Sequence, residues 1–268
     1  MKFFVHDRGD KLSKQLAESF RLQAEQKGFA WSEDHPDIVI SVGGDGTLLE
    51  AFHRYFAKSE EVAFVGVHTG HLGFYADWKP DEISELIACM AKYDLHEDPS
   101  VVVEYPILQF ETVSDQGKES FYALNEVTIK GIETTLVAQL NINDEKFEMF
   151  RGDGICISTP SGSTAYNKGL GGALIHPSIE AVQIAEIASI NNRIYRTLGS
   201  SVVLPKHHHS DIYPEKGKRL LLSIDHIYRE YHDLQALRAK VADKKVRFVR
   251  YRPFPFWNRV RDAFIGNL

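Results

Sequence analysis

The sequence predicts an α/β N-terminal domain, residues 1–98, followed by a mainly β C-terminal domain, residues 99–248. In the first third, short apolar segments alternate with segments of helical period, which is typical of a parallel sheet covered by helices. After residue 98 most segments are strand-like and are separated by turns. The chain has 268 residues, 43% hydrophobic and 25% charged, enough for two cores of this kind. Residues 249–268 are expected to return to the first domain.

In the first domain, strands are expected where apolar and β-branched residues run together, at residues 2–5, 38–42 and 62–67. Helices are expected where apolar residues recur at helical spacing, at residues 12–24, 47–57 and 80–90. In the first of these helices the apolar positions recur every four residues from Leu12 to Ala24. Gly28 is expected to end this helix as a C-cap.

In the second domain, strands are expected at residues 101–113, 121–130, 134–142, 145–150, 155–159, 201–204 and 219–224. One helix is expected to interrupt them at residues 181–190. The final segment reads as a helix that starts at Pro255 and carries one aromatic face. This face favours packing on the first domain over nucleic-acid binding, with the arginines of the tail exposed or paired with acids.

Composition and charge narrow the possible functions. The formal net charge of −6 argues against non-specific nucleic-acid binding, so no nucleic-acid partner is expected. Cys89 and Cys156 are far apart and outside any metal-binding spacing, which indicates a reducing compartment. No run of about 18 apolar residues occurs, and the N-terminus becomes polar too early for a signal peptide. These features predict a cytoplasmic protein without a membrane partner.

The strongest chemical signal is the segment Gly43-Gly44-Asp45-Gly46-Thr47, directly after a predicted strand and at the start of a predicted helix. Glycines allow the backbone to approach a ligand, and a helix N-terminus presents N–H groups to it, so Gly43, Gly44 and Thr47 form a candidate phosphate cradle. Asp45 would repel phosphate unless it binds Mg²⁺ or accepts a proton from a hydroxyl group. The alternative is a plain turn in which Asp45 caps the helix.

Two further segments carry polar groups in unusual places. Between Arg151 and Gly172 a strand leads into a turn rich in hydroxyl groups and then into a helix start, which could hydrogen-bond a base and its sugar. A cluster of serines that caps a helix explains the same pattern. Asn125 and Glu126 form a polar pair inside an otherwise apolar strand, so they are either exposed at an edge or engaged with ligand hydroxyl groups.

These three segments, in this order, resemble the NAD kinases of the short bacterial type. The glycine-aspartate segment alone is shared with lipid kinases, whereas the other two are specific to this family. Residues 68–74 and 188–193 are also similar to the family, so the resemblance covers nearly the whole chain.

The resemblance implies a kinase that uses ATP with Mg²⁺, or another divalent cation, to phosphorylate the adenosine 2′-hydroxyl of NAD. Asp45 would be the general base, with Gly46 beside the nucleotide. The other positions implied to contact nucleotide are Leu72, Phe74, Asn125, Glu126, Arg151, Asp153, Ser161, Thr164, Ala165, Tyr166, Asn167, Lys168, Gly169, Ala188 and His226. The nucleotide site is expected in the crevice between the domains. The family also implies a homotetramer or homodimer, in which Asp153 and Ala188 act across a subunit boundary.

Two other functions share part of this pattern. A diacylglycerol or sphingoid lipid kinase would use the same glycine-aspartate turn, but the hydroxyl-rich turn and the lack of an evident lipid groove argue against it. A non-catalytic NAD(P)-sensing protein would keep the nucleotide segments and lose the base, and Asp45 is present. No cluster of side chains predicts a metal site. His207, His208 and His209 are expected in a solvated turn, because no carboxylate or cysteine stands at ligand spacing.

Overall fold

The structure is a computed structural model that describes residues 1–56, 61–93, 95 and 98–266. The chain forms two compact units, one comprising Met1–Glu104 with Val246–Leu268 and the other Tyr105–Lys245. Strand β6 (Val102–Ser114) carries the chain into the second unit, and β17 (Ala236–Val249) carries it back. Within the described residues, no helix combines the length and apolar character needed to cross a membrane.

The first unit contains a parallel sheet in the order β2-β1-β3-β4, and β4 also pairs with β5 and with the last residues of β17. Its strands are β1 (Lys2–Asp7), β2 (Ala30–Trp31), β3 (Ile38–Gly43), β4 (Ala63–His68) and β5 (Ala76–Trp78). The pairing of β3 with β4 runs from Ile38 opposite Ala63 to Gly43 opposite His68. The three strands predicted for this domain therefore belong to one sheet.

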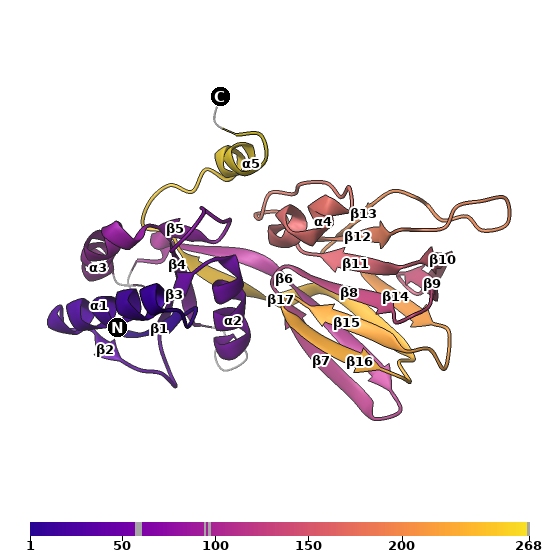
Figure 1. Cartoon of the computed structure of the whole chain (residues 1–268), viewed down its shortest axis with the longest axis horizontal. Helices are drawn as coiled ribbons and strands as arrows, with labels where there is room; N and C mark the ends of the chain where they lie inside the picture. Colours follow the sequence, from indigo (N-terminus) through magenta and orange to yellow (C-terminus); the bar gives the residue numbers. More distant parts are fainter. Residues whose placement is uncertain (57–60, 94, 96–97, 267–268) are drawn as a thin grey trace. The chain divides into compact units, whose positions relative to one another are not determined.

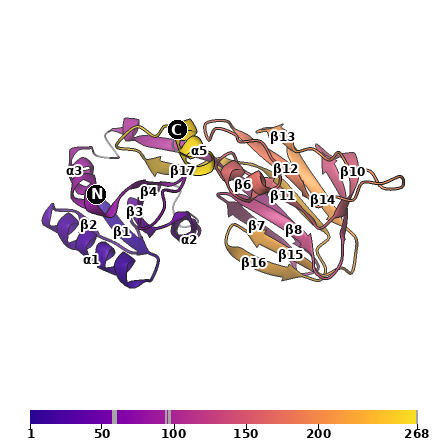
Figure 2. The ribbon, with the colours of Figure 1, turned by 45° about the horizontal axis from the view of Figure 1, so that its top comes forward.

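Helices cover both faces of this sheet (Figures 1 and 2). They are α1 (Lys11–Gln26), α2 (Asp45–Tyr55) and α3 (Ile83–Lys92), with a 3-10 turn η1 (Pro80–Glu82) before α3. Side chains alternate along a strand, so the face with Val5 and Ile40 packs on α1 and α3, while the face with Phe4 and Phe64 packs on Tyr55 and Phe52 of α2.

The structure contains each helix predicted for the first domain, with bounds that differ by a few residues. Gly28 follows α1 with a φ of +87°, a conformation that favours glycine at a helix C-terminus. α2 begins two residues earlier than predicted, and Ala57, its predicted end, lies outside the described residues. α5 (Phe256–Phe264) follows Pro255 directly, as expected.

The second unit contains two packed sheets. One has the order β10-β9-β14-β17, with β6 paired to β17 and β7 paired to β6; the other has the order β13-β12-β11-β8-β15-β16. Their further strands are β7 (Gly117–Ala123), β8 (Glu126–Gly131), β9 (Leu136–Ile142), β10 (Glu145–Gly152), β11 (Gly154–Ser158), β12 (Ala181–Ile187), β13 (Val202–Pro205), β14 (His209–Pro214), β15 (Leu220–Ile224) and β16 (Ile227–Tyr231). Apolar side chains of both sheets form one core.

The predicted helix at residues 181–190 is wrong, because residues 181–187 form β12. Six of these seven residues are buried, so both faces of the segment are covered and the sequence shows no alternation that would mark a strand. Pairing with β11, from Gly154 opposite Ile187 to Ser158 opposite Gln183, gives the segment its strand conformation.

Two other predictions in this unit need correction. The strand predicted at residues 121–130 is divided, since β7 ends at Ala123 and β8 begins at Glu126. The loop predicted around residues 207–209 ends earlier, because His209 begins β14. The pairs of β14 with β9 and β17 are contacts between distant parts of the chain, which no local pattern reveals.

Candidate functional site

Asp45 lies where strand β3 passes into helix α2. Gly44 is the N-cap of α2, so no side chain at the N-cap position hydrogen-bonds to the first N–H groups of the helix. The Asp45 carboxylate instead accepts hydrogen bonds from the backbone N–H groups of Phe74, over 2.8 Å, and of Tyr75, over 3.2 Å. Asp45 therefore binds a neighbouring loop, and the alternative in which it caps its own helix is wrong.

The glycines around Asp45 have two different roles. A Cβ at Gly43 would lie 2.2 Å from Thr47 Oγ1, so this position must stay small for the turn to close. A Cβ at Gly44 or Gly46 would meet nothing within 4 Å, so both face open space. The backbone is thus accessible beside Asp45, as a phosphate cradle requires.

The loop that holds Asp45 contains Leu72 and Phe74, two of the positions that the resemblance implies to contact nucleotide. Leu72 is 46% exposed. The ring of Phe74 packs against Phe256 and Phe264 of α5, with centroid separations of 6.2 and 5.6 Å. Two aromatic side chains of the tail therefore cover part of this loop.

In the second unit, Asn125 and Glu126 lie where the predicted strand is interrupted. The carboxylate of Asp225 accepts the backbone N–H groups of Leu124, Asn125 and Glu126, over 2.9, 2.8 and 3.1 Å. Asp225 lies between β15 and β16 with a φ of +51°, and the predicted residue His226 follows it. One carboxylate thus fixes the backbone of the Asn-Glu pair.

The hydroxyl-rich turn lies against the same backbone. Thr159 donates its N–H to the Asn125 carbonyl over 2.8 Å and its hydroxyl to the Leu124 carbonyl over 2.6 Å. A Cβ at Gly162 would lie 2.1 Å from the Asn125 carbonyl oxygen, so only glycine allows this approach. The fold thus brings together two segments that are more than 30 residues apart in sequence, and the predicted Ser161 and Thr164 are both buried there.

Glu126 has unusual electrostatics. Burial, with a smaller effect from the nearby charge of Asp225, raises its pKa to about 8. Its Oε2 atom is buried and has no hydrogen-bond partner among the described residues. A carboxyl group with this pKa holds a proton at neutral pH, so Glu126 can donate a hydrogen bond to a ligand as well as accept one.

Other buried hydroxyl groups at this end of the sheet also lack partners among the residues that the structure describes. They belong to Thr128, Ser158 and Ser161. Ser158 is opposite Glu126 in the pairing of β11 with β8. Buried polar atoms are normally hydrogen-bonded, so this group of atoms is suited to a polar ligand.

The predicted positions after the turn differ in accessibility. Ala165 joins the 3-10 turn η3 (Ser161–Thr164) to the short helix α4 (Tyr166–Gly169). Tyr166 is 38% exposed, and its hydroxyl accepts a hydrogen bond from the Lys130 ammonium group over 3.0 Å. Lys168 and Gly169 are exposed, whereas Asn167 is fully buried. The Asn167 side chain donates to the Ser163 carbonyl in the turn and to the Ala173 carbonyl after α4, so it ties the turn to the segment that follows the helix.

A separate group of predicted residues lies away from Glu126 and contains Arg151, Asp153 and Ala188. Asp153 donates its N–H to the Ile187 carbonyl over 2.9 Å, and Ala188 has a φ of +46°. They lie at the Gly154 end of β11, whereas Glu126 lies opposite its other end. These ends are about 13 Å apart along the strand, so the chain does not place this group beside Glu126.

A histidine and two carboxylates come together elsewhere in the second unit. His209, Asp144 and Asp211 place their potential ligand atoms within 4.8 Å of one another. The expectation that His209 lies in a solvated turn without a carboxylate at ligand spacing is therefore wrong. Arg238 already donates to both carboxylates, to Asp144 over 2.7 Å. These hydrogen bonds raise the pKa of Arg238, so the guanidinium stays charged and balances the negative charge of the two carboxylates.

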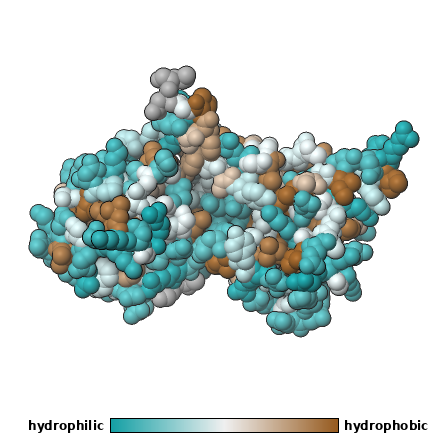
Figure 3. Space-filling model, in the orientation of Figure 1, coloured by the Kyte–Doolittle hydropathy of each residue, from teal (hydrophilic) through white to brown (hydrophobic). Residues whose placement is uncertain are grey.

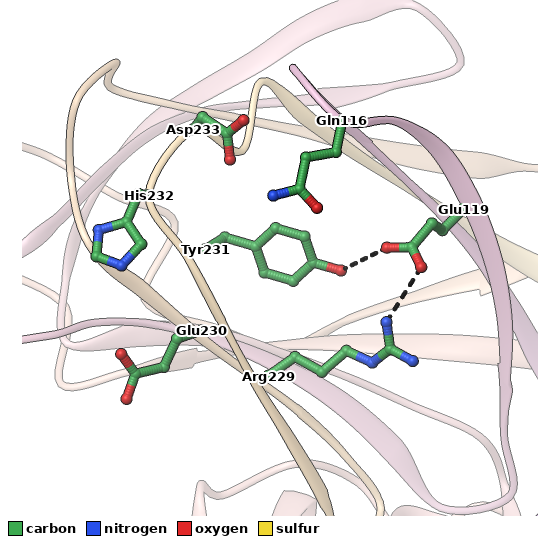
Figure 4. A pocket seen from close by; sticks show the side chains of 7 residues that line it. All are labelled: Gln116, Glu119, Arg229, Glu230, Tyr231, His232 and Asp233. Carbon is green, nitrogen blue, oxygen red and sulfur yellow. Dashed lines mark hydrogen bonds and ion pairs between the residues drawn. The ribbon is translucent and has the colours of Figure 1, made fainter.

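The described part of the chain also contains open cavities. One of about 550 Å³ contains none of the predicted site residues (Figure 4). Its Glu119 carboxylate binds Arg229 over 3.2 Å and the Tyr231 hydroxyl over 3.4 Å, so its central charges are paired. A second cavity, of about 640 Å³, includes Ala188 in its wall.

Sequence reasoning missed Asp225 and Gly73 as site residues. A Cβ at Gly73 would lie 2.2 Å from Asp45 Oδ1, so this glycine allows the loop to reach the carboxylate. An aspartate in a turn between two strand segments is a weak signal for a residue that binds backbone N–H groups. Neither role could be assigned without knowing which segments meet.

The chain was compared with protein families and with known relatives. Residues 8–94 match the ATP-NAD kinase N-terminal domain and residues 124–251 the ATP-NAD kinase C-terminal domain. The sequence is 55% identical to NAD kinase 1 of Bacillus cereus (strain ATCC 10987 / NRS 248), with 100% of both chains covered. It is 53% identical to NAD kinase 1 of Bacillus subtilis (strain 168), with 99% of each covered.

Two solved structures share the fold. Yeast NADH kinase complexed with NADH has a TM-score of 0.83 at 16% identity, covering 99% of this chain and 87% of that one. An NAD kinase from Archaeoglobus fulgidus in complex with ATP has a TM-score of 0.72 at 19% identity, covering 99% and 98%. The fold, the site and these relatives define the class of this protein as a kinase. The chain belongs to the ATP-NAD kinase family, and the lipid-kinase and sensor alternatives find no support.

Proposed function

We propose that this kinase transfers the γ-phosphoryl group of ATP to the 2′-hydroxyl of the adenosine ribose of NAD, giving ADP and NADP. The observation that carries this proposal is the position of Asp45. Its carboxylate is fixed by the N–H groups of Phe74 and Tyr75 beside two glycines that face open space. The relatives named NAD kinase support the choice of substrates.

In the proposed reaction Asp45 is the general base. It accepts the proton of the 2′-hydroxyl while that oxygen bonds to the γ-phosphorus, and the bond from this phosphorus to the oxygen bridging to the β-phosphate breaks to release ADP. Such a base contributes about 10² to 10⁴ in rate. The remainder comes from positioning and from stabilisation of charge.

The second unit supplies groups for the nucleotide's sugar and base. The buried Oε2 of Glu126 and the hydroxyl groups of Ser158 and Ser161 are suited to ribose hydroxyl and base nitrogen groups. Asn125 lies next to them, 8% exposed. The prediction that these groups and Asp45 bind one nucleotide stays a prediction.

We propose Mg²⁺ as the accompanying cation. Asp45 is a single carboxylate, which suits an ion that the phosphates of ATP hold for the most part. When bound, Mg²⁺ neutralises charge on the transferring phosphoryl group.

We further propose that the enzyme is a homotetramer or homodimer and lies in the cytoplasm. The placement of Arg151, Asp153 and Ala188 away from Glu126 supports the prediction that Asp153 and Ala188 contact nucleotide bound to another subunit. Cys89 and Cys156 are both free thiols, which supports a reducing compartment.

The test is to incubate the purified protein with ATP, Mg²⁺ and NAD and to couple the product to an NADP-specific dehydrogenase. Asp45→Asn is expected to reduce turnover at least about 100-fold, because the amide cannot accept the proton, while NAD binding is kept. Asp81→Asn, at an exposed position, is the matched control. Near-normal turnover by Asp45→Asn would contradict the role of base, and NAD binding without any turnover by the native protein would favour a sensor.

A further inference from the structure

The segment Gly73–Asp77 of the first unit connects Asp45 with the C-terminal tail. On one side its backbone N–H groups at Phe74 and Tyr75 donate to the Asp45 carboxylate. On the other side its carbonyl oxygens accept hydrogen bonds from arginines of the tail. This segment is therefore held between the carboxylate and the tail.

Arg259 of α5 makes the most extensive of these contacts. Its Nη1 donates to the carbonyl oxygen of Gly73 over 2.8 Å and to that of Ala76 over 2.7 Å. Its Nη2 pairs with the Asp77 carboxylate, which is itself buried. Only 12% of the Arg259 side chain is exposed. An arginine with this geometry is fixed by three partners on one short segment.

The rest of the tail reinforces this attachment. Arg250 donates to the Tyr75 carbonyl over 3.1 Å, and Arg252 donates to the Asp77 carbonyl. Aromatic residues of α5 pack on the Phe74 ring. Figure 3 shows apolar surface in the region where Figure 1 places α5. Trp257 of α5 is 55% exposed, and Ile265, directly after the helix, is 73% exposed. The arginines and the aromatic face together dock the tail on the segment.

One peptide group links Arg259 directly to Asp45. The Gly73 carbonyl, which accepts from Arg259, and the Phe74 N–H, which donates to Asp45, belong to the same peptide unit. This unit is planar and trans, so its oxygen and its hydrogen point in opposite directions, and fixing one fixes the other. A hydrogen bond to the oxygen also polarises the N–H and strengthens its bond to the carboxylate.

We propose that Arg259 is a positioning residue for the reaction, which aligns Asp45 through the Gly73–Phe74 peptide group. The inference rests on the proposed function, since it concerns the group that accepts the substrate proton. The C-terminal tail thereby influences the reaction through the Gly73–Phe74 peptide group.

The experiment compares Arg259→Met with Arg261→Met in the coupled assay. Both changes remove one positive charge from α5, but Arg261 is exposed and pairs with its neighbour Asp262. Arg259→Met is expected to lower kcat about 10- to 100-fold, because the carboxylate loses its alignment. The KM for NAD is expected to change by less than about threefold, since the Arg259 guanidinium is already engaged by Gly73, Ala76 and Asp77. Arg261→Met is expected to match the native enzyme.

A double variant separates positioning from a general loss of structure. If Arg259 acts through Asp45, then Arg259→Met adds no further loss of kcat in the Asp45→Asn background. Additive losses, or an Arg259→Met variant with native kcat, would overturn the proposal. Should Arg259→Met fail to fold, Arg259→Lys replaces it, because lysine keeps the charge without the planar fork, and the same non-additivity is expected. Failure of the native protein to form NADP would overturn the proposed function instead.

Discussion

Asp45 and Glu126 are two carboxyl groups whose surroundings give them different properties. The Asp45 carboxylate lies at an open turn and accepts hydrogen bonds from two backbone N–H groups. Glu126 has a buried oxygen without a partner among the described residues, and burial raises its pKa. At neutral pH the second unit thus offers a proton-bearing carboxyl group at Glu126, whereas the first unit offers a carboxylate fixed by backbone groups.

The pKa of Glu126 predicts a pH dependence of stability. Its value is about 8 in the folded chain against 4.5 for an ordinary glutamate. Between these values the folded state holds a proton that the unfolded state lacks, so the free energy of unfolding falls as pH rises, by up to about 1.4 kcal/mol per pH unit. Glu126→Gln removes this contribution. The native protein is therefore expected to lose stability relative to Glu126→Gln from pH 5 to pH 8.

Urea unfolding of the ligand-free proteins at several pH values across this interval measures the effect. Glu104→Gln, at an exposed position, is the matched control. A difference between native protein and Glu126→Gln that does not vary with pH would contradict the assigned protonation.

At the scale of elements, the break between β7 and β8 sets the backbone conformation of the Asn125–Glu126 pair. Apolar residues on both sides of Asn125 predict one continuous strand. Asp225 accepts the three N–H groups at the break, which replaces the strand pairing that these groups would otherwise need. The interruption directs the Asn-Glu pair toward the hydroxyl-rich turn.

Asp225→Asn tests this element. The amide keeps one acceptor oxygen and tolerates a positive φ, but it cannot satisfy three N–H groups as the carboxylate does. The free energy of unfolding is expected to fall by about 1.5 to 3 kcal/mol, measured by urea unfolding at neutral pH. Asp243→Asn, whose carboxylate is 86% exposed, is the control and is expected to change stability by less than about 0.5 kcal/mol. Equal stability of the two variants would contradict the bracing role of Asp225.

At the scale of the whole molecule, the first unit is built from both ends of the chain. Phe248 and Val249 of β17 are fully buried in it. The Phe248 ring stacks on Tyr75 at 5.5 Å and lies 6.4 Å from Phe64. The second unit has its own core, formed by its two sheets. Each unit is therefore expected to behave as a separate cooperative unit of folding.

Phe248→Ala tests this expectation. Loss of a buried aromatic ring is expected to destabilise the first unit by about 3 to 5 kcal/mol. Amide hydrogen exchange should show reduced protection in β3 and β4 and native protection in β8 and β11. Ile265→Ala, at a position that is 73% exposed, is expected to leave both regions unchanged. Equal loss of protection in both units would show that the chain unfolds as one.

The sequence determined those features that depend on local pattern. Helical spacing and a C-terminal glycine defined α1, and the strand before Gly43 with the helix after it placed Asp45 at the turn between them. The hydroxyl-rich turn and the Asn-Glu pair could be found because polar groups stand out in apolar surroundings. Family resemblance rested on these same residues.

Only the tertiary structure decided which groups hold these segments and side chains in place. Segment 181–187 is a strand because β11 lies beside it, and its sequence alone suits a helix equally well. The partners of Asp45 are backbone N–H groups at Phe74 and Tyr75, and backbone groups are identical in every residue, so no sequence pattern identifies them. Arg259 is joined to Asp45 through one peptide group although the two residues are 214 positions apart along the chain, because the tail returns to the first unit.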